Sequence, residues 1–203
     1  GIDATGKLWG WGANYNKVFA RLDVRDDQMG YAGVTGKPVL VGDPGITWKK
    51  IETGSDFVVG LKSDSTLWSW GGGDLTLGRN ITTWQTDTVP VSMGPEKWLE
   101  VCLGTNYGMA ISADSLLHTW GRNDFGQLGN DSFNSTLVPT VVSELKWVSI
   151  TCGFEGAYGR TKGSLNFKWG KQLNAEGVDT NLVSLTAFSG TPTEMSAGQS
   201  HGL

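Results

Sequence analysis

The chain of 203 residues is long enough for one large all-β domain or two small domains, and its hydrophobic content of 38% excludes an intrinsically disordered chain. Its formal net charge is −4 and it has no basic run, which disfavours nucleic-acid binding because a phosphate backbone requires a cluster of cations. No apolar stretch approaches the roughly 18 residues that a membrane-spanning helix needs.

The first predicted strand covers residues 7–11, whose sequence KLWGW has the alternation of a strand and ends at Trp11. The Trp-Gly dipeptide found there recurs three more times, at spacings of 59, 50 and 49 residues. The later copies begin at Trp70, Trp120 and Trp169. A fixed period of about fifty residues indicates a repeat architecture.

The segment between Asn14 and Pro38 makes the first repeat about ten residues longer than the others. It lacks the turn glycines of the other repeats and carries Tyr, Phe, Met and Arg, which are enriched where proteins bind proteins. A surface excursion folded onto its own blade is the alternative explanation. We predict that a partner protein is contacted by Phe19, Arg21, Arg25, Met29 and Tyr31.

Each later repeat is expected to supply four short strands, and the second repeat shows them in order. Pro38 is expected to open one strand, where a missing N–H is tolerable, and Trp48 starts the next. A third strand follows Gly54, and a tight turn at residues 63–65 leads into the strand that ends at Trp70. The same elements recur around Pro90, Trp98 and Gly104, and around Pro139, Trp147 and Gly153.

One four-stranded sheet cannot bury both of its faces, so similar sheets must pack face to face around an axis. The predicted fold class is therefore all-β, a β-propeller of four-stranded antiparallel blades with four repeats in this chain. A sandwich or a β-solenoid is the structural alternative, but a sandwich requires no repeat and a solenoid coil is usually shorter. Residues 1–203 are predicted to form a single propeller domain.

The fixed phase of most tryptophans favours packing between blades over sugar stacking. The tryptophans concerned are Trp9, Trp11, Trp68, Trp70, Trp120 and Trp169. Trp84 has no counterpart in the other copies, so we predict that it contacts a partner at the surface.

The two cysteines, Cys102 and Cys152, do not make a disulfide framework and do not fix the redox compartment. They fall at adjacent, opposite-facing phases of equivalent segments. We therefore expect no disulfide between them.

Residues 117–130 read LHTWGRNDFGQLGN. This stretch resembles the Leu-x-x-Trp-Gly-x-Asn-x-x-Gly-Gln-Leu-Gly pattern of the regulator-of-chromosome-condensation family, and the other three copies resemble it less closely. The Trp-rich form is similar to bacterial and phage members of that family more than to its eukaryotic nuclear members. The resemblance implies a propeller that binds or assembles with other proteins, although one fold hosts many functions.

The two ends of the chain are in phase with the repeat. Residues 198–203 align with residues 54–59, and residues 1–3 align with residues 60–62, so joining the ends restores the 16-residue spacing found in other repeats. Either the chain closes a four-bladed ring or it is a piece of a longer array, such as the seven-bladed rings for which the family is known. The junction falls inside a predicted strand, which favours the longer array.

No constellation of catalytic, cofactor-binding or metal-binding residues is expected. His118, in a strand where another copy has Ser69, and His201 are interpreted as hydrogen-bonded packing residues. No acid or oxyanion motif accompanies Ser200-His201, which argues against catalysis there. No His or Cys pair has metal-ligand spacing, and no predicted helix follows the glycines at 71–73 to hold a phosphate. Three aspartates at hairpin positions are interpreted as turn formers: Asp3, Asp64 and Asp114.

The sequence thus predicts a non-enzymatic scaffold that binds another protein and has no cofactor, with a phage virion or a bacterial surface as the leading setting. The alternatives are a small-GTPase regulator of the chromosome-condensation-regulator type, by resemblance alone, and a carbohydrate-binding propeller. The predicted location is the virion or the cell exterior, with the cytoplasm as the alternative. Sequons at Asn80, Asn130 and Asn134 would carry glycans only in a eukaryotic secreted protein.

Overall fold

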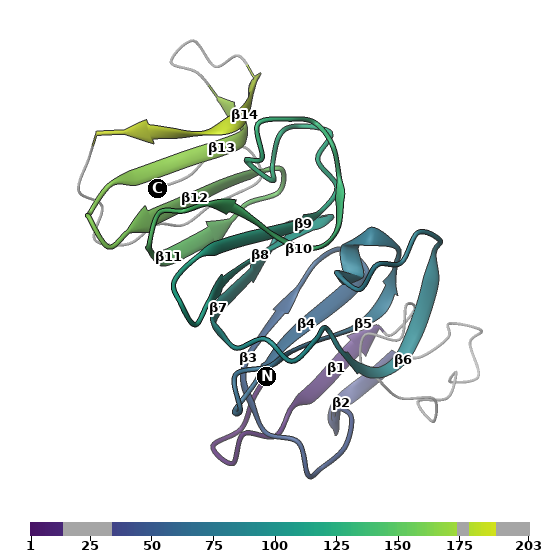
Figure 1. The fold of residues 1–203 in the computed structure, drawn as a ribbon. Coiled ribbons are helices and arrows are strands. Elements are labelled where there is room, and N and C mark those ends of the chain that lie inside the picture. Colours follow the sequence, from purple (N-terminus) through teal and green to yellow (C-terminus); the bar gives the residue numbers. More distant parts are fainter. Residues whose placement is uncertain (14–33, 174–178, 190–203) are drawn as a thin grey trace.

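The computed structural model describes residues 1–13, 34–173 and 179–189 (Figure 1). These residues form strands and one short 3₁₀ turn, and no α-helix occurs among them. In chain order the elements are β1 (Trp9–Ala13), β2 (Val34–Leu40), β3 (Trp48–Thr53), β4 (Phe57–Lys62), β5 (Leu67–Gly73), η1 (Leu75–Leu77), β6 (Gln85–Ser92), β7 (Trp98–Leu103), β8 (Tyr107–Ser112), β9 (Leu117–Gly121), β10 (Thr136–Ser143), β11 (Trp147–Cys152), β12 (Gly156–Thr161), β13 (Asn166–Leu173) and β14 (Asp179–Phe188).

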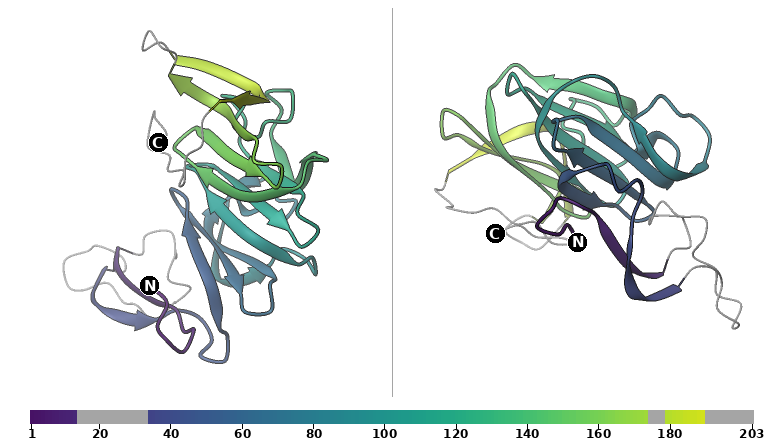
Figure 2. Two further views of the ribbon diagram at one scale, coloured as in Figure 1. Left: turned by 90° about the vertical axis from the view of Figure 1, so that its left-hand side faces the viewer. Right: turned by 90° about the horizontal axis from the view of Figure 1, so that it is seen from below.

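The strands make three four-stranded antiparallel sheets, β3–β6, β7–β10 and β11–β14, and one two-stranded sheet, β1–β2. Every strand pairs with its neighbour in the chain, so each sheet is a meander and forms one blade. The sheets follow one another face to face in chain order, from purple to yellow (Figures 1 and 2). The predicted all-β propeller of four-stranded blades is confirmed. The choice between a closed four-bladed ring and a piece of a longer array stays open, because residues 190–203 lie outside the described part of the chain.

The hairpin turns between the second and third strands of each blade lie where the sequence predicts them. Ser65, Ser115 and Ser164 adopt positive φ angles of 70°, 69° and 62° at equivalent turn positions. Asp64 stabilises the first of these turns, because its Oδ1 accepts hydrogen bonds from the backbone N and the Oγ1 of Thr66, at 2.9 and 2.6 Å. Asp64 is therefore a turn former, as predicted.

The three prolines expected to open strands lie inside strands instead. Pro38, Pro90 and Pro139 belong to β2, β6 and β10, each of which ends the strand order of its sheet. The pairing register shifts beside each proline, as it does between Thr136 and Thr140 on β10. An edge strand with a bulge has no ladder bond to lose at that position, so proline is tolerated within it.

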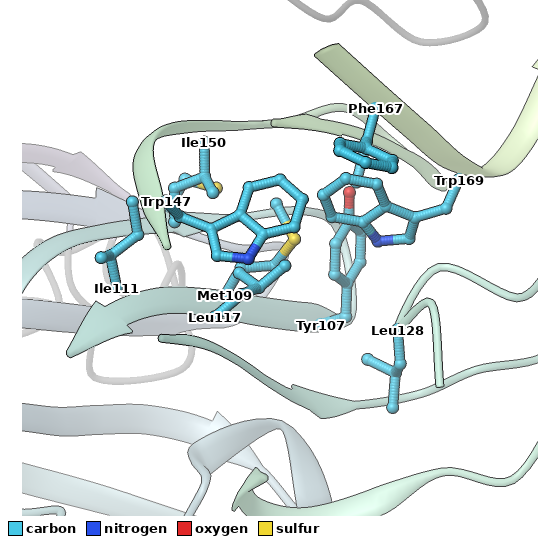
Figure 3. Close-up of a cluster of buried hydrophobic side chains, with 11 residues drawn as sticks. Tyr107, Met109, Ile111, Leu117, Leu128, Trp147, Ile150, Phe167 and Trp169 are labelled. Carbon is cyan, nitrogen blue, oxygen red and sulfur yellow. The ribbon is translucent and has the colours of Figure 1, made fainter. Parts of the chain in front are cut away.

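A hydrophobic core fills each interface between successive blades. The core between β3–β6 and β7–β10 is built from Phe57, Val59, Leu61, Leu67, Leu77, Trp98, Val101, Leu103, Ala110 and Trp120. Figure 3 shows the next core, in which Trp147 and Trp169 pack on Tyr107 and Met109 of the preceding blade. Trp70, Trp120 and Trp169 are each 0% exposed, which confirms that they pack between blades.

Trp11 departs from this pattern, since 57% of its surface is exposed. Trp70 packs with Leu8 and Val41, which adjoin β1 and β2 of the preceding sheet. Trp11 lies on β1, and within the described residues no sheet precedes β1 in the chain. The expectation that Trp11 packs between blades is therefore wrong for this part of the chain.

Backbone hydrogen bonds also recur from blade to blade. The amide of Ser55 donates to the carbonyl of Thr105 at 3.0 Å, and the amide of Thr105 donates to the carbonyl of Phe154 at 3.3 Å. These three residues occupy equivalent turns of consecutive blades. The two interfaces between the three four-stranded blades therefore share the same backbone hydrogen bond.

Cys102 in β7 and Cys152 in β11 form a disulfide, with their Cα atoms 5.7 Å apart. The expectation of no disulfide is therefore wrong. In the pairing register, Cys102 corresponds to Thr151 rather than to Cys152, so the cysteines do lie on opposite faces of their own sheets. Neighbouring blades, however, present opposite faces to each other. Because the two cysteines lie on opposite faces of consecutive sheets, both sulfurs point into the interface between those sheets.

Candidate protein-binding surface

The antiparallel meander places two kinds of connection on one side of the propeller, here called the loop face. Short turns join the first and second strands of a blade, and longer loops join the third and fourth strands. The loop face comprises residues 54–56, 74–84, 104–106, 122–135 and 153–155. In the β7–β10 blade a backbone bond ties the two kinds together, from the amide of Arg122 to the carbonyl of Asn106 at 2.9 Å.

The loop after β9 is held by a buried asparagine. The side-chain Oδ1 of Asn123 accepts a hydrogen bond from the amide of Leu128 at 2.9 Å. Its Nδ2 lies 2.8 Å from the carbonyl of Ser132 and 3.0 Å from that of Asn134. Asn123 is 0% exposed, so one side chain fixes both halves of the loop. This explains the Asn of the Trp-Gly-x-Asn pattern in physical terms.

The two long loops, residues 74–84 and 122–135, are each hydrogen-bonded to the following blade. The indole Nε1 of Trp120 donates to the carbonyl of Thr76 at 3.0 Å. The equivalent indole of Trp169 donates to the carbonyl of Gln127, also at 3.0 Å. Because the donors are fully buried tryptophans, these hydrogen bonds anchor the loops to the close-packed core.

Two large aromatic side chains stand exposed on the long loops 74–84 and 122–135, and a third, Phe154, is 42% exposed on the short turn 153–155. Trp84, which precedes β6, is 58% exposed, and Phe133, which precedes β10, is 55% exposed. The predicted exposure of Trp84 is confirmed, while its contact with a partner stays a prediction. Phe133 was missed by sequence reasoning. Its signal was an aromatic residue in an otherwise Asn- and Ser-rich loop, in the same stretch of the repeat as Trp84.

The cations of the described loop face are paired with carboxylates. Arg79 bonds to Asp87. Arg122 lies 3.3 Å from Asp74 of the preceding blade. Close by, Lys171 lies 3.5 Å from Glu155, and its ammonium lies 5.4 Å from the ring centre of Phe125. Asp124 and Asp131 are exposed. The surface around the two aromatics therefore combines apolar rings with carboxylates.

The predicted contact residues of the first repeat lie outside the described residues. These are Phe19, Arg21, Arg25, Met29 and Tyr31. The segment that carries them leaves β1 at Ala13 and returns at Val34, and these two residues are register partners. β1 and β2 correspond to the third and fourth strands of the other blades. Both ends of the segment therefore lie on the loop face, on the same side as Trp84.

His118 packs within β9 as predicted. Its ring lies edge-on to that of Trp98, with 4.8 Å between the ring centres. Burial lowers the pKa of His118 below its usual value, and a hydrogen bond to the backbone of Pro139 partly opposes the shift. His201 lies outside the described residues.

The described residues contain no group of three or more His, Cys, Asp and Glu side chains that could hold a metal ion. A largely apolar pocket of about 210 Å³ lies between β1 and the β3–β6 blade. Its lining includes Leu8, Trp11, Ile51, Val58 and Trp70 and no titratable side chain. Within the described part of the chain, no helix is long and apolar enough to cross a membrane.

Residues 114–155 match the model of the regulator of chromosome condensation (RCC1) repeat. This match covers the motif at residues 117–130 and confirms the resemblance predicted from it. No curated protein sequence matches the chain.

Among solved structures, human WBSCR16 is similar with a TM-score of 0.79 and 18% identity, over 99% of this chain and 53% of that chain. Prp20p from Saccharomyces cerevisiae gives a TM-score of 0.79 and 17% identity, over 98% and 51% of the two chains. Yeast RCC1 (Prp20) bound to Kap60 gives 0.74 and 18%, over 99% and 50%. Likeness at these identities shows the fold alone. The chain spans about half the length of each of these structures.

Proposed function

We propose that this chain is a non-enzymatic β-propeller scaffold that binds another protein through its loop face. The observation that carries the proposal is the pair of exposed aromatics, Trp84 and Phe133, on loops that hydrogen bonds fasten to the core. Aromatic residues on a rigid support bury a large area at little entropic cost, which is why they dominate binding energy at protein interfaces.

The similar structures support a protein-binding role in general terms. One of them holds yeast RCC1 (Prp20) bound to Kap60, and another concerns the binding properties of Prp20p to Gsp1p and histones. Kap60, Gsp1p and histones are partners of Prp20, and the likeness does not assign them to this chain. For this chain the likeness supports a propeller whose surface serves recognition.

Regulation of a small GTPase is the second candidate. It rests on the match of residues 114–155 to the RCC1 repeat and on the likeness to Prp20p. These findings favour it over a role in a phage virion or on a bacterial surface, for which none of the three structures gives support. The virion or surface setting and the carbohydrate-binding role stay predictions.

The test begins with a photo-crosslinking amino acid placed at position 84 of the full chain, and at position 165 as a control. Leu165 is also exposed, but it lies beside a hairpin turn on the opposite side of the propeller. A protein captured from source cells by position 84 alone is then purified. Its binding is measured against the wild-type chain, the double variant W84A/F133S and the variant L165S.

We expect W84A/F133S to weaken binding by on the order of tenfold or more and L165S to leave it unchanged. Equal binding by all three proteins would place the binding surface elsewhere. The GTPase candidate is tested separately, by release of labelled GDP from purified small GTPases with and without the chain. No acceleration across that set removes this candidate and leaves the scaffold proposal standing.

A further inference from the structure

A single covalent link joins two neighbouring blades in the described part of the chain, the Cys102–Cys152 disulfide. Its cysteines lie on β7 and β11, the first strands of consecutive blades. They are 50 residues apart in sequence, which is one repeat. Cys102 belongs to the buried cluster of that interface, and Cys152 packs against it.

The disulfide is specific to this interface. At the preceding interface the register places Glu52 and Leu103 at the positions of Cys102 and Cys152. The carboxylate of Glu52 forms an ion pair with Lys50 at 3.0 Å instead. The crosslink is thus a local addition to a repeating interface and does not belong to the repeat itself.

Noncovalent contacts next to the disulfide already hold the two blades together. The hydroxyl of Tyr107 is buried and lies 3.1 Å from the carbonyl of Gly153 and 2.8 Å from that of Gly156. The amide of Thr105 reaches the carbonyl of Phe154. These contacts directly follow Cys152 in the chain. The interface can therefore form before the sulfurs are joined, and it brings them together.

We propose that the Cys102–Cys152 disulfide is a redox-responsive clamp that limits opening between the β7–β10 and β11–β14 blades. The clamp closes when the folded chain meets an oxidising compartment. The two thiols then lose two protons and two electrons and form one S–S bond, while the disulfide of a thiol oxidoreductase takes up both and becomes two thiols. A dithiol reductant reverses the exchange. Disulfides persist mainly in oxidising compartments, so the closed clamp implies residence there.

The test uses the full chain directed to the bacterial periplasm. Free thiols are blocked with a maleimide before and after reduction and counted by mass spectrometry. Amide hydrogen exchange is then compared between the oxidised and the reduced protein. The variant C102S/C152S serves as the control that cannot close the clamp.

We expect no maleimide on either cysteine before reduction and one on each afterwards. Reduction should speed exchange in β11 and β12 by on the order of tenfold or more, leave β4 and β5 unchanged, and lower the unfolding midpoint by on the order of 5–10 °C. C102S/C152S should show the hydrogen exchange and the unfolding midpoint of the reduced protein, and adding reductant should change neither. Free thiols in the periplasmic protein, or equal exchange in both redox states, would overturn the proposal. If the variant does not fold, a graded series of reductant on the wild-type chain makes the same comparison.

Discussion

The indole nitrogen of Trp169 donates a 3.0 Å hydrogen bond to the carbonyl oxygen of Gln127 in the preceding blade. Trp120 makes the same bond to Thr76 one blade earlier. The aromatic packing and the loop geometry are therefore coupled through one buried donor and one carbonyl. Removing the donor leaves that carbonyl without this partner inside the core, which is costly.

The variant Trp169→Phe should lower the free energy of unfolding by about 1–3 kcal/mol, because it removes the donor and part of the ring. Trp84→Phe is the matched control, since the indole it alters is exposed, and it should change stability by less than about 0.5 kcal/mol. Urea unfolding followed by circular dichroism measures both. Equal stability of the two variants would mean that the Gln127 bond contributes nothing.

The variant Gly159→Ala should destabilise the β11–β14 blade. A Cβ at Gly159 would lie 2.4 Å from Cζ3 of Trp147, so the buried indole must move. We expect a loss of about 1–3 kcal/mol, the usual cost of overpacking a core. Gly163→Ala is the control, because its Cβ would meet nothing closer than 3.8 Å, at Thr161. A similar loss in both alanine variants would show that the contact with Trp147 does not set the effect.

Stability should fall as the pH drops below about 6.5 because of His118. Burial lowers the pKa of His118 in the folded chain, so the unfolded chain binds a proton at a higher pH than the folded chain does. Its contribution to stability is therefore full above the unfolded pKa and is lost as the pH falls towards the folded pKa. Melting curves between about pH 8 and pH 5 should show this for the wild-type chain, and His118→Gln should flatten the dependence. Parallel curves for the two proteins would contradict the assignment to His118.

Deleting residues 18–31 should leave the propeller folded and abolish assembly with its partner protein. The deletion removes Phe19, Arg21, Arg25, Met29 and Tyr31 and keeps the Ala13–Val34 pairing of β1 with β2. Circular dichroism checks the fold, and size-exclusion chromatography with the captured partner checks assembly. If the shortened chain still assembles, the segment is a surface excursion and the binding face lies elsewhere.

The repeat made most of the fold predictable. Trp70, Trp120 and Trp169 could be placed between blades because period and residue type recur together, and one packing arrangement satisfies all three of these copies. Position within a strand was harder to predict. Pro139 lies inside β10 because a bulged edge strand tolerates it, and sequence alone does not reveal a bulge.

The disulfide was predicted wrongly for a geometric reason. The sequence correctly predicted that Cys102 and Cys152 lie on opposite faces of their own sheets. Opposite faces would separate two cysteines of one sheet, but in stacked sheets they bring the cysteines together. Half of the candidate surface was predicted, since Trp84 was singled out by its lack of a counterpart. Phe133 was not, because its exposure depends on how the buried Asn123 holds the two halves of the loop, a tertiary arrangement that composition alone does not give.

The contacts that Ser55 and Thr105 make to the next blade run in one direction, from the amide of one repeat to the carbonyl of the following repeat. The stack of blades therefore has a direction, with donor amides facing the following repeat and acceptor carbonyls facing the preceding one. A duplicated repeat inserted at a blade boundary would find a matching donor on one side and a matching acceptor on the other. Lengthening the stack by whole repeats thus adds units of similar interface energy, and repeat number becomes a quantity that evolution can change without redesigning the interface.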